Sequence, residues 1–299
     1  MLEKSNFNEA SWLRWAAETK EEAEICIMGV PFDNAVSLNK GAAKAPENIR
    51  LLSVDLSDTT DEFIPIKDGL LYDAGDIHAL LDWEKYFGEV EESALELMKT
   101  GNMCLFLGGD HSVTIPLHKA FRRYHGDKKL GIIHFDAHYD LCPEYDGHIW
   151  SHACTEARAL EGVVNDVDLS FVGVRVAEET ELELIKENPG ILTIRAADVY
   201  DRGADSIIEQ LTAKYSGYDA IYLTLDIDVL DPAYAPGTGT PVSGGLNPFE
   251  LTRIFRGLLK NLPIRAMDIV EVAPPLDVND VTTWAAMKII HELFTFYSK

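Results

Sequence analysis

The sequence predicts an α/β fold in which helices cover both faces of a central, mostly parallel sheet. Two observations lead to this prediction. Short apolar runs alternate along the chain with longer amphipathic stretches, as in successive strand–helix units. The apolar runs are also continuous, which is typical of strands that are buried on both faces of a parallel sheet.

Eight apolar runs have the length and composition of strands. They are Ile25–Val30, Leu70–Asp73, Met103–Leu107, Leu130–Phe135, Leu169–Val174, Ile191–Ile194, Ala220–Leu225 and Ile264–Val270. The stretches between them carry apolar residues at helical spacing. The expected helices are Trp83–Lys99, Val113–Tyr124, Cys154–Leu160, Glu178–Glu187, Ala204–Tyr215, Pro248–Lys260 and Val281–Tyr297.

The composition favours a single globular domain over residues 1–299. The chain is 46% hydrophobic and 25% charged, which is ordinary for a folded protein, and it contains no repeat, low-complexity segment or Pro/Gly-rich linker. Four scattered cysteines and a polar, helix-like N-terminal segment without a signal-peptide core predict a cytoplasmic protein with reduced thiols. No apolar run is long enough to span a membrane, so we expect no membrane partner.

The formal net charge of −24 limits the partners of the protein. Nucleic-acid binding needs clustered Lys and Arg to neutralise phosphates, so we expect no nucleic-acid partner. An acidic surface attracts a small cationic substrate, although solubility alone explains the same charge. Net charge by itself does not identify a ligand.

Three of the predicted strands end in residues of the types that bind metal ions. They run into GGDHS (108–112), DAHYD (136–140) and DIDVLDP (226–232). The carboxyl ends of parallel strands share one edge, where ligands of α/β sheets bind, so these groups can converge. Two long loops leave from the same edge, CPEYDGHIWS (142–151) and DPAYAPGTGTPVSGGL (231–246).

Alternation along an extended backbone would place Asp136, His138 and Asp140 on one face, and Asp226 and Asp228 on another. Without counterions these carboxylates would repel one another, and divalent cations resolve that conflict. Oxygen-rich sites with some imidazole suit Mn²⁺, with Zn²⁺, Fe²⁺ or Co²⁺ as competitors. Four carboxylates can offset two divalent ions, which predicts a binuclear centre.

Each motif taken alone has a simpler interpretation. GGDHS is typical of a turn followed by a helix that Asp110 or Ser112 caps. Asp226 and Asp228 can cap a helix or pair with arginines, and Asp231 before a proline is typical of a turn. The metal interpretation depends on finding all three motifs at successive strand ends.

Together the motifs resemble those of the arginase–agmatinase (ureohydrolase) family. The resemblance begins near Gly29, extends to the last predicted helix and includes GTGTP (237–241) and EVAPPLD (271–277). It implies an arginase-like three-layer α/β/α fold with an eight-stranded sheet, two Mn²⁺ per subunit, and hydrolysis of guanidinium groups to urea. It also implies a homo-oligomer, trimer or hexamer. The helical C-terminus or the exposed Trp12 and Trp15 could supply an interface, although core packing explains them as well.

The resemblance also implies a role for each ligand, and no ligand position departs from the family pattern. One ion would be held by His111, Asp136, Asp140 and Asp226. The other would be held by Asp136, His138, Asp226 and Asp228, with Asp136 and Asp226 bridging the two ions.

Within the family the chain looks most like the agmatinases. SHAC (151–154) resembles their SHAC/SHG segment, and EVAPPLD resembles their EVAPPYD. Arginases carry an Asn two residues after the last Asp of DAHxD, where it helps to hold the α-carboxylate of arginine, and here that position is Cys142. Val242 and Ser243 depart from the usual agmatinase sequence GTGTPEPGG, and Thr224 replaces the usual Ser before DxD, which leaves the tail specificity open.

The expected reaction is the hydrolysis of agmatine to putrescine and urea. A guanidinium carbon is a poor electrophile, and two metals lower the pKa of a bridging water to near 7, so that the hydroxide can attack it. Asp140 would pass a proton to the leaving amine, Glu271 would hold the guanidinium, and His152 would shuttle protons. His148 is a second, solvent-facing candidate for the shuttle, and His134 is expected to be a hydrogen-bonded structural histidine.

Acidic groups near the mouth of the site would favour an amine tail on the substrate. Glu144, Asp146, Glu178 and Glu179 lie in suitable loops, although each is more simply a solvated surface charge. The alternatives are arginase, guanidinobutyrase, guanidinopropionase and formiminoglutamase, which would differ only in the pocket for the tail. In a different class, the chain would be a catalytically silent metal-binding member of the fold.

Overall fold

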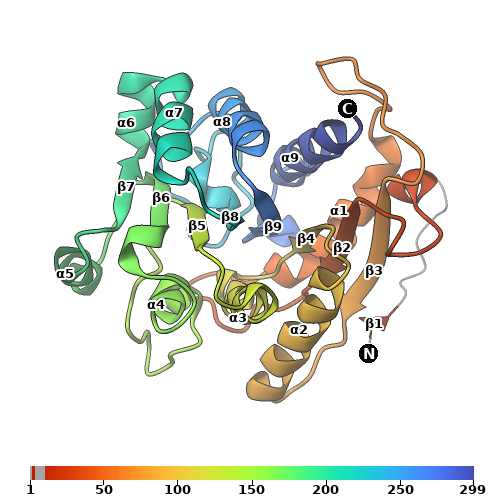
Figure 1. Cartoon of the computed structure of the whole chain (residues 1–299). Helices are drawn as coiled ribbons and strands as arrows, with labels where there is room; N and C mark the ends of the chain where they lie inside the picture. The colour runs from red at the N-terminus through yellow and green to blue at the C-terminus, as the bar shows by residue number, and fades with distance from the viewer. Residues whose placement is uncertain (1, 4–10) are drawn as a thin grey trace.

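One continuous sheet forms the middle layer of the computed structural model, which describes residues 2–3 and 11–299 (Figure 1). The strand order is β1-β3-β2-β4-β9-β8-β5-β6-β7. The eight predicted strands, β2 to β9, are all parallel, and the two-residue β1 adds an antiparallel pair at the β3 edge. The strands are β1 (Leu2–Glu3), β2 (Ile25–Gly29), β3 (Leu71–Ile77), β4 (Met103–Leu107), β5 (Leu130–Phe135), β6 (Leu169–Val174), β7 (Leu192–Arg195), β8 (Ala220–Asp226) and β9 (Ile264–Val270).

Helices cover both faces of the sheet, as predicted (Figure 1). Helices α2, α3 and α4 lie on one face, and α1, α6, α7, α8 and α9 lie on the other, each layer with its own apolar core. The helices are α1 (Ala45–Leu52), α2 (Trp83–Met98), α3 (Thr114–His125), α4 (Thr155–Leu160), α5 (Glu179–Glu187), α6 (Ala196–Arg202), α7 (Ala204–Lys214), α8 (Pro248–Asn261) and α9 (Val281–Tyr297). None of the helices in the described part of the chain is long and apolar enough to cross a membrane.

Helices α1 and α6 were not predicted from the sequence. Both are short, so few positions are available to reveal a helical period. In addition, α1 buries the charged Arg50, whose Nε lies 2.8 Å from Asp73 Oδ2 and whose guanidinium also contacts Asp76 on β3. Because the buried face of α1 contains an arginine, the sequence shows no continuous apolar stripe there.

The N-terminal segment differs from its prediction. Instead of an α-helix, residues 12–15 form a short 3₁₀ helix, and turns lead from it to β2. Trp12 and Trp15 are not exposed: 0% and 3% of their surfaces are accessible, and both rings pack edge-on against Phe294 of α9. They therefore belong to the core. The rest of the predicted segment, residue 1 and residues 4–10, lies outside the described residues.

The strand register brings the carboxyl ends of four central strands to one level. One row of paired residues crosses β5, β8, β9 and β4, namely Phe135, Leu225, Ile269 and Leu107. Asp136 directly follows β5, Asp226 is the last residue of β8, and Glu271 directly follows β9. Parallel pairing therefore places residues from distant parts of the chain at the same edge of the sheet.

Candidate active site

The segment after β4 both caps a helix and directs a histidine toward the sheet edge. Asp110 Oδ1 accepts a hydrogen bond from the Ser112 N–H at 3.1 Å and caps a 3₁₀ turn, as its simpler interpretation predicted. Gly109 passes so close to the backbone of Phe32 that an added Cβ would lie 1.7 Å from its carbonyl oxygen. This tight packing fixes the backbone that carries His111, which is fully buried.

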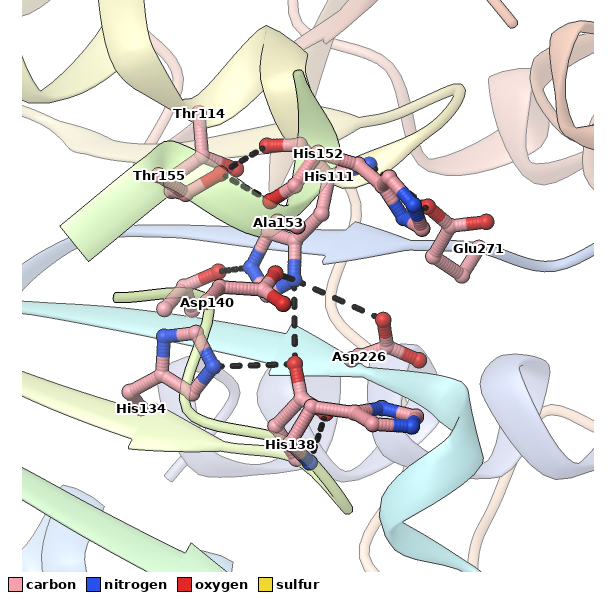
Figure 2. Close-up of polar contacts among 12 residues, drawn as sticks. His111, Thr114, His134, His138, Asp140, His152, Ala153, Thr155, Asp226 and Glu271 are labelled. Atoms are coloured by element: carbon pink, nitrogen blue, oxygen red, sulfur yellow. Dashed lines mark hydrogen bonds and ion pairs between the residues drawn. The ribbon is translucent and has the colours of Figure 1, made fainter. Parts of the chain in front are cut away.

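His111 faces three carboxylates at the centre of the site (Figure 2). Its Nδ1 lies 3.0 Å from Asp140 Oδ2, 3.1 Å from Asp136 Oδ2 and 3.4 Å from Asp226 Oδ2. Despite these short distances, Nδ1 makes no well-aligned hydrogen bond within the described residues. The three carboxylates converge from the ends of β5 and β8 on the same ring nitrogen.

The opposite ring nitrogen of His111 determines what Nδ1 can do. Nε2 lies 2.8 Å from Thr224 Oγ1, and the single hydroxyl proton of Thr224 is donated to Asp268 Oδ1 at 2.6 Å. Thr114 and Tyr222 donate to Asp268 Oδ2, each at 2.8 Å. Thr224 Oγ1 therefore accepts from the His111 Nε2–H, so in the neutral ring the lone pair is on Nδ1. A lone pair facing three carboxylates fits a shared metal cation.

A second group of ligands surrounds His138. Its Nδ1 lies 3.2 Å from Asp136 Oδ1 and 3.2 Å from Asp228 Oδ2. The two oxygens of Asp136 thus face different histidines, Oδ1 toward His138 and Oδ2 toward His111. His138 is the more open of the two, with about a quarter of its side chain (25%) accessible. This division of one carboxylate between two ligand groups suits a bridging ligand.

The prediction that strand alternation places the residues of each motif on one face is wrong, because the chain does not stay extended. Strand β5 ends at Phe135, before the first aspartate of its motif, and Asp140 adopts a left-handed backbone with φ of 51°. After β8 the chain enters a 3₁₀ turn in which Asp226 accepts a hydrogen bond from the Asp228 N–H at 2.8 Å. Turns, rather than extended strands, aim these side chains. A positive φ at a non-glycine residue is energetically unfavourable and is frequent at functional sites.

The buried carboxylates of the two ligand groups are not fully neutralised by the positive charges around them. Burial raises the pKa of Asp226 well above its usual range, and the neighbouring Asp228 and Asp136 carboxylates raise it further. Burial and Asp136 likewise raise the pKa of Asp228. Two divalent ions would remove this conflict. His134 also lies close to the first ligand group, but both of its ring nitrogens have carboxylate partners.

His152 and Glu271 lie together beside the ligand groups (Figure 2). His152 Nδ1 is 3.3 Å from Glu271 Oε1, and the same oxygen accepts a hydrogen bond from the His111 N–H at 2.8 Å. Glu271 is almost completely buried and has a positive φ of 61°. The strained backbone at Glu271 and at Asp140 therefore marks two of the three predicted catalytic residues.

Ser37 can support His152 in either protonation state. The Ser37 N–H and the Ser37 hydroxyl both lie 3.0 Å from His152 Nε2. The N–H donates to the neutral ring, whereas the hydroxyl can accept from the protonated ring. Burial lowers the pKa of His152, but the Glu271 carboxylate, followed by Asp140 and Asp110, raises this pKa to about 9. This arrangement suits a residue that both takes up and releases a proton.

A cavity of about 190 Å³ opens over these groups. Its lining residues are Ser37, His138, Asp140, Cys142, Tyr145, His152, Ala153, Val176, Glu178, Glu181, Asp226 and Thr240. Glu178 lines this cavity, whereas Asp146 lines a neighbouring one and Glu144 and Glu179 line neither. His148, the second shuttle candidate, lines the neighbouring cavity and packs on Trp83. Glu271 does not line the cavity, because it lies behind His152.

Sequence reasoning missed several residues that support the site. Arg175, which follows β6, donates from Nη2 to the carbonyl oxygens of Asp228 at 2.6 Å and Val242 at 2.7 Å. It therefore fixes the second aspartate of DIDVLDP against the Gly-rich loop. A lone arginine directly after an apolar strand is the only sequence signal for it. Ser37 and Glu156 have no comparable signal in the sequence.

Comparison with known proteins places the chain in a recognised group. A family model described as the Arginase family matches residues 23–295. Agmatinase of Neisseria meningitidis serogroup C (strain 053442) is 37% identical over 282 residues, which cover 92% of this chain and 87% of that protein. The agmatine ureohydrolase structure of Thermoplasma volcanium matches with a TM-score of 0.86 and 29% identity, over 98% of this chain and 95% of that one. The structure of formimidoylglutamase from Bacillus subtilis matches with a TM-score of 0.89 and 25% identity, over 100% of this chain and 94% of that one.

Proposed function

The chain belongs to the arginase family, and on this premise we propose that it hydrolyses agmatine to putrescine and urea. Membership of the family makes it a hydrolase that acts on guanidino compounds. The observation that carries the choice of agmatine is an acidic residue, Glu178, in the same cavity as the ligand groups. A guanidinium at the metal end and an ammonium at the Glu178 end would both find negative partners.

We propose two Mn²⁺ ions as the cofactor. The six predicted ligands, His111, Asp136, His138, Asp140, Asp226 and Asp228, would hold them, with Asp136 and Asp226 shared. When bound, such an ion pair supplies an activated water and stabilises the charge of the transition state. The lone pair on His111 Nδ1 and the surplus of carboxylates support this proposal.

Three residues of the chain would handle the substrate and its protons. Glu271 would orient the guanidinium by charge-assisted hydrogen bonds from its second oxygen, Oε2, which lies near Gly239. Asp140 would receive a proton at its carboxylate and pass it to the leaving amine. His152, held by Glu271 and Ser37, would exchange that proton with the solvent that enters the cavity.

The lining of the cavity distinguishes an amine tail from a carboxylate tail. The lining residues named above include two glutamates, Glu178 and Glu181, but no lysine or arginine. Burial raises the pKa of Cys142 to about 12, so this residue stays a neutral thiol. A neutral thiol provides no positive charge to bind a substrate carboxylate. Guanidinobutyrate, guanidinopropionate, arginine and formiminoglutamate all carry a carboxylate that would meet these acidic groups without a cationic partner.

The test is an assay of the Mn²⁺-loaded protein against a substrate panel. Urea release would be measured from agmatine, arginine, 4-guanidinobutyrate and 3-guanidinopropionate, and formamide release from formiminoglutamate. We expect a clear preference for agmatine. Preference for a guanidino acid would overturn the proposed tail, and two bound metals without turnover of any compound would favour the catalytically silent alternative.

Three further proposals concern the whole chain. We propose one domain over residues 1–299, which the continuous sheet supports, and a cytoplasmic location, which four buried, unpaired cysteines support. We also propose a homo-oligomer, trimer or hexamer, as is usual for the family. Light scattering coupled to size-exclusion chromatography measures the oligomeric state, and a monomer would contradict it.

A further inference from the structure

A buried chain of three side chains leads away from the ligand groups. His134 Nε2 lies 2.9 Å from Asp136 Oδ2, and His134 Nδ1 lies 2.8 Å from Glu156 Oε1. The accessible fractions of the side chains of His134, Asp136 and Glu156 are 0%, 1% and 0%. Glu156 thus contacts one ring nitrogen of His134, and the other ring nitrogen contacts Asp136, the proposed bridging ligand.

Glu156 lies in the first turn of α4, four residues after His152, and its backbone is also tied to the site. Its N–H donates to the carbonyl oxygen of Asp140 at 2.9 Å. The neighbouring Thr155 hydroxyl lies 3.0 Å from the His111 carbonyl oxygen (Figure 2). The segment that carries His152 therefore joins the ligand edge at several points, and Glu156 contributes both a backbone contact and a side-chain contact.

The buried position of Glu156 lowers the stability of the folded state. Its second oxygen, Oε2, is buried and has no hydrogen-bond partner within the described residues. An unsatisfied buried carboxylate oxygen costs free energy, and an apolar side chain of similar size avoids that cost. A glutamate at this position therefore indicates a role that an apolar side chain cannot fill, and its contact with His134 supplies one.

We propose that Glu156 is a positioning residue for the metal centre, because it holds His134 against Asp136. The proposal rests on the metal centre proposed above. His134 contacts Oδ2, which is the oxygen of Asp136 that faces His111, so the ion on the His111 side depends on this contact most. Partners that orient a metal ligand typically change metal affinity about 10- to 100-fold.

The experiment measures Mn²⁺ binding to the metal-free protein and does not require turnover. Free Mn²⁺ would be followed by electron paramagnetic resonance during titration of the wild type, Glu156→Gln and Glu156→Leu. We expect one of the two binding steps to weaken about 10- to 100-fold in both variants. We also expect metal-free Glu156→Leu to resist urea unfolding less well than the wild type, because the buried His134 Nδ1 loses its only carboxylate partner. A purely structural residue would lower stability and leave Mn²⁺ binding of the folded protein unchanged.

Two further variants make the test specific. Because Glu156 acts through His134, adding Glu156→Gln to His134→Gln should weaken Mn²⁺ binding no further than His134→Gln alone. Glu292 is the matched control: it is a buried carboxylate, 2.6 Å from Arg256, on the far helix α9. We expect Glu292→Gln to lower stability and leave Mn²⁺ binding unchanged. Unchanged binding in both Glu156 variants, or additive effects of Glu156→Gln and His134→Gln, would overturn the proposal.

Discussion

The ligand edge of the sheet and the mouth of the cavity lie next to each other but are held in different ways. At the ligand edge, His111, Asp136 and Asp228 are at most 1% accessible, and hydrogen bonds from the backbone or from neighbouring side chains fix each one. At the mouth, Glu178 and Tyr145 belong to connecting segments and are exposed. The predicted metal ligands are therefore anchored at the ends of paired strands, whereas the residues proposed to recognise the tail lie in loops, whose sequence can change without moving the ligands.

The largest expected effect comes from removing a shared ligand at the sheet edge. Asp226→Asn takes one carboxylate from both proposed ion sites, so we expect urea release to fall about 10²- to 10³-fold or more. Metal analysis of the purified variant should find fewer than two Mn²⁺ per chain. A variant that retains two ions and near-normal activity would show that Asp226 is not a shared ligand.

His152 lies at the boundary between the two regions. His152→Asn should reduce kcat by about 10²-fold and change Mn²⁺ content little, because in the proposed mechanism His152 transfers protons and is not a metal ligand. Rates at saturating Mn²⁺ and agmatine, together with metal analysis, check this expectation. An unchanged kcat would transfer the shuttle role to His148 or to solvent.

The pH dependence of stability tests the pairing of His152 with Glu271. The pKa of about 9 in the folded, metal-free protein lies above the ordinary value for histidine. The folded state therefore holds the extra proton more tightly, and this stabilisation is fully present below about pH 6.5 and is lost as the pH rises through 9. For His152 it amounts to about 3 kcal/mol. Urea unfolding of the metal-free protein at pH 6 and pH 9.5 should show a smaller loss in His152→Asn than in the wild type, and equal losses would contradict the pairing.

Removing a residue that orients a predicted metal ligand, but is not itself a ligand, should have an intermediate effect. Thr224→Val removes the hydroxyl that accepts a hydrogen bond from the His111 Nε2–H. Without this contact the ring is no longer held with Nδ1 facing the carboxylates. We expect Mn²⁺ binding to weaken about tenfold, and Thr224→Ser to bind as the wild type does. If valine and serine gave the same affinity, the hydroxyl would have no role in orienting His111.

The smallest expected effect lies at the mouth. Glu178→Gln should raise the KM for agmatine by about tenfold with little change in kcat, because the partly exposed ion pair proposed between Glu178 and the tail would be lost. Glu144→Gln is the matched control, since Glu144 is an acid in a neighbouring loop that does not line the cavity. Equal KM values for the wild type and Glu178→Gln would mean that another group recognises the tail.

The sequence by itself determined the chemistry of the ligand edge. The apolar runs before GGDHS, DAHYD and DIDVLDP predict strands of one parallel sheet, and parallel strands end at a common edge, so the six metal-type residues can meet there. In the structure β5 and β8 are neighbours, and β9 lies between β8 and β4. The run before EVAPPLD likewise predicts β9, which carries Glu271 to the same edge. These predictions succeed because burial and strand pairing leave few other arrangements for continuous apolar runs.

Only the tertiary structure decided how the side chains are aimed and supported. Asp140 and Glu271 reach their places through positive φ angles, which strand alternation does not predict. Glu156 meets His134 across 22 residues, and Ser37 meets His152 across 115, so neither pair leaves a local signal in the sequence. Periodic burial encodes which strands form, whereas contacts between loops depend on where the finished sheet places them.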